Sequence, residues 1–135
     1  MNETKLKGLT TELYCQLFFT SLGYNVSVPL SEDCKYDLIV DIKGRLYKIQ
    51  VKTCCEDETG IKFSTKSSYL TAKGTVINNY NETNVDFFAT YYKGKCYLIP
   101  FSCCGSSSKK LTFKRKTGTG FIEDYEALKI ISKLK

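Results

Sequence analysis

Apolar and polar side chains alternate on either side of a Lys-Gly pair in "YDLIVDIKGRLYKIQVKT", residues 36–53. A period of two, rich in β-branched and aromatic residues, predicts a strand on each side of the pair. Lys43-Gly44 suits a two-residue turn because glycine accepts a positive φ. The stretch is therefore predicted to form a β-hairpin.

The register set by this turn gathers three polar side chains on one face. Asp37 is expected to face Gln50, and Lys52 lies on the same face, diagonal to Asp37. The other face is apolar and is expected to point to a core, through Tyr36, Leu38, Val40, Ile42, Tyr47, Ile49 and Val51.

Helical spacing marks both ends of the chain. Residues 5–22 are predicted to form an amphipathic helix, with Thr10 or Thr11 as candidate N-cap and Gly23 as the stop. Its expected buried stripe is Leu6, Leu9, Leu13, Leu17 and Leu22. A second helix is predicted over residues 122–135, where Tyr125, Leu128, Ile131 and Leu134 recur.

The remaining segments predict further short strands and loops. An extended piece is expected at 24–30, short strands near 61–64 and 111–115, and a second hairpin from strands 85–92 and 95–100. Residues 65–84 are polar without a clear period, which favours a long loop. The order indicates an α+β fold, a central mixed β-sheet flanked by helices, in a single domain spanning 1–135.

Composition narrows the chemistry. The 135-residue chain has no His, which excludes His-based general bases, catalytic triads and HNH-type nuclease sites. No secretion signal or membrane-length apolar run is visible, so the seven cysteines are expected to be reduced thiols in the cytoplasm. The net charge of +6 and the stretch "KKLTFKRK" favour a polyanionic partner.

Asp37, Gln50 and Lys52 together suit a Mg²⁺ site, because carboxylate and amide oxygens are hard ligands and Mg²⁺ needs few of them. The carbonyl of Val51 is a further candidate ligand. Lys52 would orient or deprotonate the attacking water. A second acid is needed, and Glu12, at the edge of the first helix's stripe, is the candidate; Asp41 is too far, at roughly 13 Å from Asp37 along the strand.

The spacing of Asp37 from Gln50-x-Lys52 across a hairpin resembles the PD-(D/E)XK nuclease motif. "LGYNVSVPL", "VDFFATYYKGKCYLIP" and "FIEDYEAL" further resemble the branch of small homing endonucleases encoded in bacterial group I introns, as does an opening Lys7-Gly8 before a helix that carries an acid. The resemblance implies a restriction-endonuclease-like core and a homo-oligomer, dimer or tetramer, that cleaves double-stranded DNA with Mg²⁺. It also implies an active site of Glu12, Asp37, Gln50 and Lys52. Tyr36 departs from the motif's Pro, and residues 54–84 match poorly.

Basic residues outside the motif are the candidate DNA contacts. The basic stretch offers phosphate contacts, and the irregular region offers groups that suit base edges. The first set is Lys109, Lys110, Lys114, Arg115 and Lys116. The second is Lys62, Lys66, Tyr69, Lys73, Asn78 and Asn79.

Three alternatives stay open at this point. One is a structure-selective nuclease such as a Holliday junction resolvase on the same core. Another is a DNA-binding module that has lost metal affinity, since Gln50 is neutral. The third is a zinc-bound structural protein using Cys54, Cys55, Cys103 and Cys104, although adjacent cysteines lack the usual ligand spacing.

Overall fold

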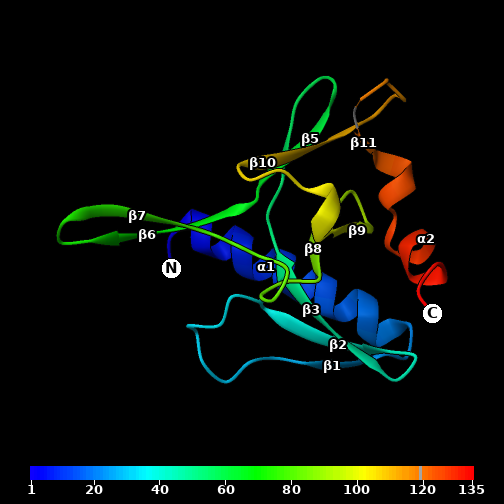
Figure 1. The fold of residues 1–135 in the computed structure, drawn as a ribbon, viewed down its shortest axis with the longest axis horizontal. Helices are drawn as coiled ribbons and strands as arrows, with labels where there is room; N and C mark the ends of the chain where they lie inside the picture. The colour runs from blue at the N-terminus through cyan, green and yellow to red at the C-terminus, as the bar shows by residue number, and fades with distance from the viewer. Residues whose placement is uncertain (119) are drawn as a thin grey trace.

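A five-stranded mixed sheet forms the centre of the fold (Figure 1). The computed structural model describes residues 1–118 and 120–135, apart from the side chains of residues 67–71, 77 and 78. The strand order is β1-β2-β3-β8-β9; β3 and β8 run parallel and the other neighbours antiparallel. The strands are β1 (Asn25–Ser27), β2 (Leu38–Ile42), β3 (Arg45–Val51), β8 (Phe87–Tyr92) and β9 (Lys95–Pro100).

The β2–β3 hairpin has the predicted register. Leu38 pairs with Ile49 and Val40 with Tyr47. Lys43 and Gly44 both have positive φ, 57° and 84°, as a type I′ turn requires. The Gly44 N–H donates to Asp41 Oδ1 at 3.0 Å, so Asp41 stabilises the turn.

Different elements cover the two faces of the central sheet. The helices α1 (Glu3–Ser21) and α2 (Ala127–Ser132) pack on one face with the apolar side of the hairpin. The other face packs through Phe88 and Ile99 against a second sheet of order β11-β10-β5-β4. The α+β prediction with a mixed sheet and helices is confirmed. The second sheet consists of β4 (Cys55–Glu56), β5 (Gly60–Ser64), β10 (Ser108–Thr112) and β11 (Gly120–Phe121).

The first helix begins earlier than predicted. Asn2 is its N-cap and accepts a hydrogen bond from the Lys5 N–H at 2.8 Å. Thr10 and Thr11 lie inside the helix, where their hydroxyls donate to backbone carbonyls four residues back. The predicted cap is therefore wrong, and Lys7-Gly8 lies within α1 rather than before it.

The predicted leucine stripe of α1 is also wrong: it is exposed. The buried residues of α1 are Thr11, Cys15 and Phe19, on the opposite side of the helix. Tyr36, expected in the core, is half-buried, and Lys48 Nζ lies 5.9 Å from its ring centroid. The exposed leucines are Leu6, Leu9, Leu13, Leu17 and Leu22.

The C-terminal helix is shorter than predicted. Residues Ile122–Tyr125 form the 3₁₀ turn η2, and α2 follows from Ala127 to Ser132. The buried residues of α2 are Ala127, Ile130 and Ile131, while Leu128 is exposed. The predicted spacing therefore located a helix but named one wrong member of its packed face.

Residues 65–84 do not form a long loop. They contain an antiparallel pair, β6 (Lys66–Thr71) and β7 (Gly74–Asn79), which extends away from the rest of the fold (Figure 1). We call this pair the arm. In the basic stretch, the strand is Ser108–Thr112 rather than the predicted 111–115. The 3₁₀ turn η1 (Phe101–Cys103) is the one element not yet mentioned.

No helix in the described part of the chain has the length and apolar character to span a bilayer. All seven cysteines are free thiols. Cys15 and Cys96 meet in the core, with sulfur atoms 4.0 Å apart.

Candidate active site

Asp37 is fixed at the start of β2 by two backbone contacts. Its N–H donates to the Ile49 carbonyl at 2.9 Å, which extends the hairpin ladder by one residue. Its Oδ2 accepts the Val51 N–H at 2.9 Å. The carboxylate is thereby held beside the end of β3, opposite Gln50 as the register requires.

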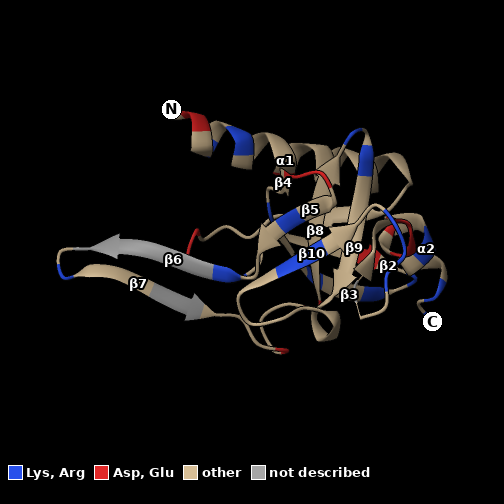
Figure 2. Ribbon diagram, turned by 90° about the horizontal axis from the view of Figure 1, so that it is seen from above, with Lys and Arg blue, Asp and Glu red and all other residues tan. Residues whose placement is uncertain are grey.

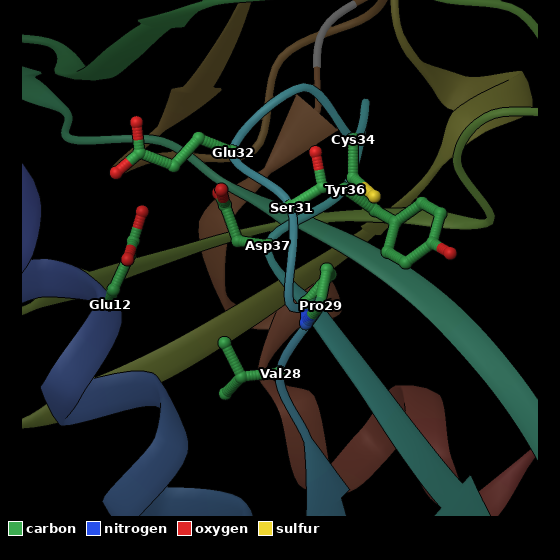
Figure 3. Close-up of a pocket in the computed structure, with 8 residues that line it drawn as sticks. All are labelled: Glu12, Val28, Pro29, Ser31, Glu32, Cys34, Tyr36 and Asp37. Atoms are coloured by element: carbon green, nitrogen blue, oxygen red, sulfur yellow. The ribbon is translucent and has the colours of Figure 1, made fainter.

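Glu12 reaches Asp37 from α1. It follows the buried Thr11, whose hydroxyl lies 3.2 Å from that of Thr53, so the helix is seated against the end of β3. Glu12 and Asp37 line one pocket of about 340 Å³. Figure 3 shows their carboxyl groups entering it from α1 and from the start of β2. The predicted approach of Glu12 is correct, although the predicted stripe was not.

The two carboxyl groups disturb each other's titration. Burial, the charge of Asp37 and a hydrogen bond with Asp37 raise the pKa of Glu12 from 4.5 to about 7. Burial also raises the pKa of Asp37, against the opposing effects of the Val51 N–H, Glu12 and Lys52. Two half-buried acids therefore share a proton near neutral pH.

Lys52 completes the polar face of the hairpin. Burial lowers its pKa, and the charge of Asp37 opposes that shift. Its Nζ donates to the Lys66 carbonyl at 2.8 Å and lies 5.1 Å from the ring centroid of Tyr80. The two contacts come from the start of the arm and from the residue after its end. The lysine is thus shared between the carboxylate pair and the arm.

Gln50 and Val51 occupy the end of β3 between the acids and the lysine. Gln50 Nε2 makes a long contact of 3.4 Å with the Val51 carbonyl. The amide and the carbonyl are therefore neighbours at the site where both were predicted as neutral ligands.

The oxygen atoms of Glu12, Asp37, Gln50 and the Val51 carbonyl suit Mg²⁺ better than they suit a metal ion that takes all its ligands from protein side chains. Within the described residues, no group of three or more Cys, Asp or Glu side chains is placed to hold a metal ion. Mg²⁺ retains several waters and is commonly bound by one or two carboxylates. A divalent cation would replace the shared proton and relieve the repulsion between Glu12 and Asp37. The zinc alternative gains no support, since the thiols of Cys54 and Cys104 contact the carbonyls of Tyr91 and Pro100.

Sequence reasoning missed three neighbours of the site. Tyr80 and the Lys66 carbonyl lie in the segment interpreted as a loop, where no periodic signal marked them. Glu32 lies in the loop between β1 and β2, and its carboxyl group also reaches the pocket (Figure 3).

The candidate DNA contacts are distributed over the second sheet and the arm. Lys62 and Lys110 are direct neighbours across β5 and β10. Figure 2 shows basic residues on these strands, at the start of β6 and at the tip of the arm, where Lys73 lies. Lys66 is half-buried, and Lys114 and Lys116 are exposed beyond β10. The side chains of Tyr69 and Asn78 lie outside the described residues.

Several of these basic groups already have partners. Lys110 pairs with Asp57, and Arg115 Nη1 lies 2.9 Å from Asp124 Oδ2. Lys109 Nζ lies 5.5 Å from the ring centroid of Tyr125. The charge that β10 and its loop offer to a polyanion is therefore smaller than the sequence suggests.

Comparison with known proteins agrees with this geometry. The fold is similar to that of a bacterial homing endonuclease, I-Ssp6803I, with a TM-score of 0.77 and 25% identity over 98% of this chain and 95% of that one. Protein 5.3 of Escherichia phage T7 is 39% identical over 59 residues, which are 44% of this chain. That match spans only half, 50%, of the phage protein's length.

The PD-(D/E)XK endonuclease family model matches residues 2–125, nearly the whole chain. The match includes the helix that carries Glu12, the hairpin that carries Asp37, Gln50 and Lys52, and the arm. The chain belongs to the PD-(D/E)XK endonuclease family.

Proposed function

We propose that this chain is a Mg²⁺-dependent endonuclease that hydrolyses phosphodiester bonds of double-stranded DNA at a specific site, as a homo-oligomer. The observation that supports it most is the pairing of Glu12 with Asp37 beside Lys52. The fold similarity to a protein named as a bacterial homing endonuclease supports the site-specific form of the activity. Membership of the group I intron branch is part of the same proposal.

The roles follow from how each side chain is held. Asp37, with Oδ2 fixed by the Val51 N–H, offers Oδ1 to the cation, and Glu12 offers a second carboxylate after losing its proton. Gln50 and the Val51 carbonyl supply neutral oxygens. A bound Mg²⁺ would polarise the phosphoryl oxygen and lower the pKa of the attacking water. Lys52, whose pKa is lowered by burial, positions that water or stabilises charge on the phosphate.

A cleavage assay on a DNA library tests the proposal, with wild type compared with Lys52→Ala and each protein assayed with Mg²⁺ or EDTA. Wild type with Mg²⁺ is expected to cut and to reveal its target, and EDTA to abolish cutting. Lys52→Ala is expected to lose at least about 100-fold in rate, a typical contribution of a positioned acid–base group. Lys129→Ala, an exposed lysine on α2, is the matched control and should cut as wild type.

The outcomes separate the alternatives. Equal cutting by wild type and Lys52→Ala would show that the site is elsewhere. Cutting of four-way junctions but not of linear duplex would indicate a structure-selective nuclease. DNA binding with no cutting under any metal condition would indicate a binding module.

A further inference from the structure

Helix α1 has two apolar faces, and the described part of the chain covers only one of them. Thr11, Cys15 and Phe19 face the sheet. A row of four leucines lies on roughly the opposite side of a helix with about 3.6 residues per turn. We call this row the leucine stripe. Its exposed fractions are 54% for Leu6, 41% for Leu9, 52% for Leu13 and 63% for Leu17.

The stripe is a continuous surface rather than scattered exposure. Its members recur at steps of three, four and four residues, which keeps them on one side of the helix. Figure 2 shows α1 as an outer layer whose far side carries no other described element. Single exposed leucines are ordinary, but a row of this length marks a contact surface.

The charges of the helix exclude nucleic acid as the occupant of the stripe. Those outside the active site are confined to its first five residues, in Glu3, Lys5 and Lys7. The residues that flank the stripe further along are uncharged: Thr10, Gln16 and Thr20. DNA binding requires Lys or Arg at the phosphates, and this half of the helix offers neither.

We propose that the leucine stripe is the surface through which two copies of this chain associate, with the two α1 helices packed antiparallel. If the two helices cross between Leu9 and Leu13, the antiparallel arrangement places Lys5 of each copy beside the uncharged half of the other helix. A parallel pair would place the two charged ends, and the two Lys5 side chains, side by side. The same patch then serves both copies, as a symmetric interface requires.

This inference rests on the proposed function, because the cleavage of both DNA strands is what requires two copies of the chain. Each chain carries one Glu12–Asp37–Lys52 site, and a duplex has two strands to cut. Glu12 lies on α1 between Leu9 and Leu13 in sequence, on the flank between the stripe and the sheet. Association through the stripe therefore sets the separation of the two active sites directly.

Sedimentation velocity across a concentration series, without DNA or divalent metal, tests the interface. The variant is Leu9→Gln/Leu17→Gln, which keeps residues compatible with a helix and adds no charge. The control is Leu46→Gln/Leu128→Gln, two leucines with exposed fractions of 64% and 58% on β3 and α2. Circular dichroism and a thermal melt check that each protein stays folded.

Wild type and control are expected to sediment as a dimer or a larger even assembly. The stripe variant should raise the dissociation constant by about 10,000-fold, from roughly tenfold for each of the four leucines that the two copies together lose from the contact. The folded variant should still nick one strand of a plasmid while losing double-strand breaks.

Three results would overturn the inference. These are a monomeric wild type at high concentration, an unchanged assembly in the stripe variant, or equal dissociation of the control. Any of them leaves the cleavage result untouched, because sedimentation uses neither DNA nor metal. The opposite combination is also informative. If only the stripe variant fails to associate and wild type cuts no DNA, the proposed interface stands and the proposed nuclease activity is rejected.

Discussion

Lys52 belongs to the active site and to the arm at once. Its ammonium group interacts electrostatically with Asp37 but donates a hydrogen bond to the Lys66 carbonyl, and the ring of Tyr80 lies beside it. A motif search finds the lysine and the acid, because their spacing is a property of the hairpin. It does not find the carbonyl or the ring, because they come from a segment 14 to 28 residues later, joined to the site only by tertiary structure.

Glu12 gives a prediction for stability against pH. Its pKa is about 7 in the folded chain against its ordinary value of 4.5, so the folded state binds an extra proton between these pH values. The stability it contributes is complete below about pH 4.5 and is lost as pH rises through 7. In EDTA, the unfolding free energy of wild type should fall across this window relative to that of Glu12→Gln.

Urea denaturation of both proteins from pH 4 to 8 measures this difference. Glu12→Gln should be the more stable protein at pH 8, because it no longer places a second charge beside Asp37. Parallel curves for the two proteins would contradict the raised pKa. Since Glu12 is only about half-buried, the difference is expected to be modest.

The hairpin and α1 show what a periodic pattern can and cannot predict. In the hairpin, the turn fixes the register, and a one-residue shift would place every apolar side chain on the wrong face. In α1, the pattern located a real apolar face but not what covers it. The face that packs includes Thr11 and Cys15, which are too small and too polar to stand out beside four leucines. The arm escaped prediction because both of its strands are rich in polar residues.

The ion pair between β10 and the β4–β5 turn gives a prediction for DNA affinity. Asp57 neutralises Lys110, and its pKa is lowered by that lysine and by the Thr59 hydroxyl and backbone N–H groups. Asp57→Asn keeps the amide oxygen that accepts the Thr59 and Gly60 N–H groups but frees the charge of Lys110. The variant should bind duplex DNA more tightly, with a salt slope steeper by about 0.9, as expected for one added phosphate contact.

Fluorescence anisotropy with a labelled duplex at several salt concentrations measures this slope. Lys62→Ala, across the strand from Lys110, should make the slope shallower by a similar amount. Asp33→Asn, which removes an exposed acid outside the second sheet, is the matched control. A slope that shifts equally in the control would mean that net charge, rather than this strand pair, governs binding.

The whole molecule separates two surfaces across the central sheet. α1, with its leucine stripe, packs on one face, and β5 and β10, with Lys62 and Lys110, pack on the other (Figure 2). The carboxylate pair lies where α1 meets the mouth of the hairpin, and Lys52 links that point to the arm. In the proposed assembly, copies meet along the leucine stripe, DNA contacts Lys62 and Lys110 on the other face, and the carboxylate pair lies between these two surfaces.

Mixed assemblies test whether two copies cut as one unit. Wild type is incubated with a tenfold excess of Lys52→Ala before Mg²⁺ and target plasmid are added. Most wild-type chains then share an assembly with an inactive copy and hold one working site, so the main product should change from linear to nicked DNA. The same excess of the Leu9→Gln/Leu17→Gln/Lys52→Ala chain, which does not associate through the stripe, should leave linear DNA as the product. Linear DNA in both mixtures, in proportion to wild type, would mean that a single chain cuts both strands.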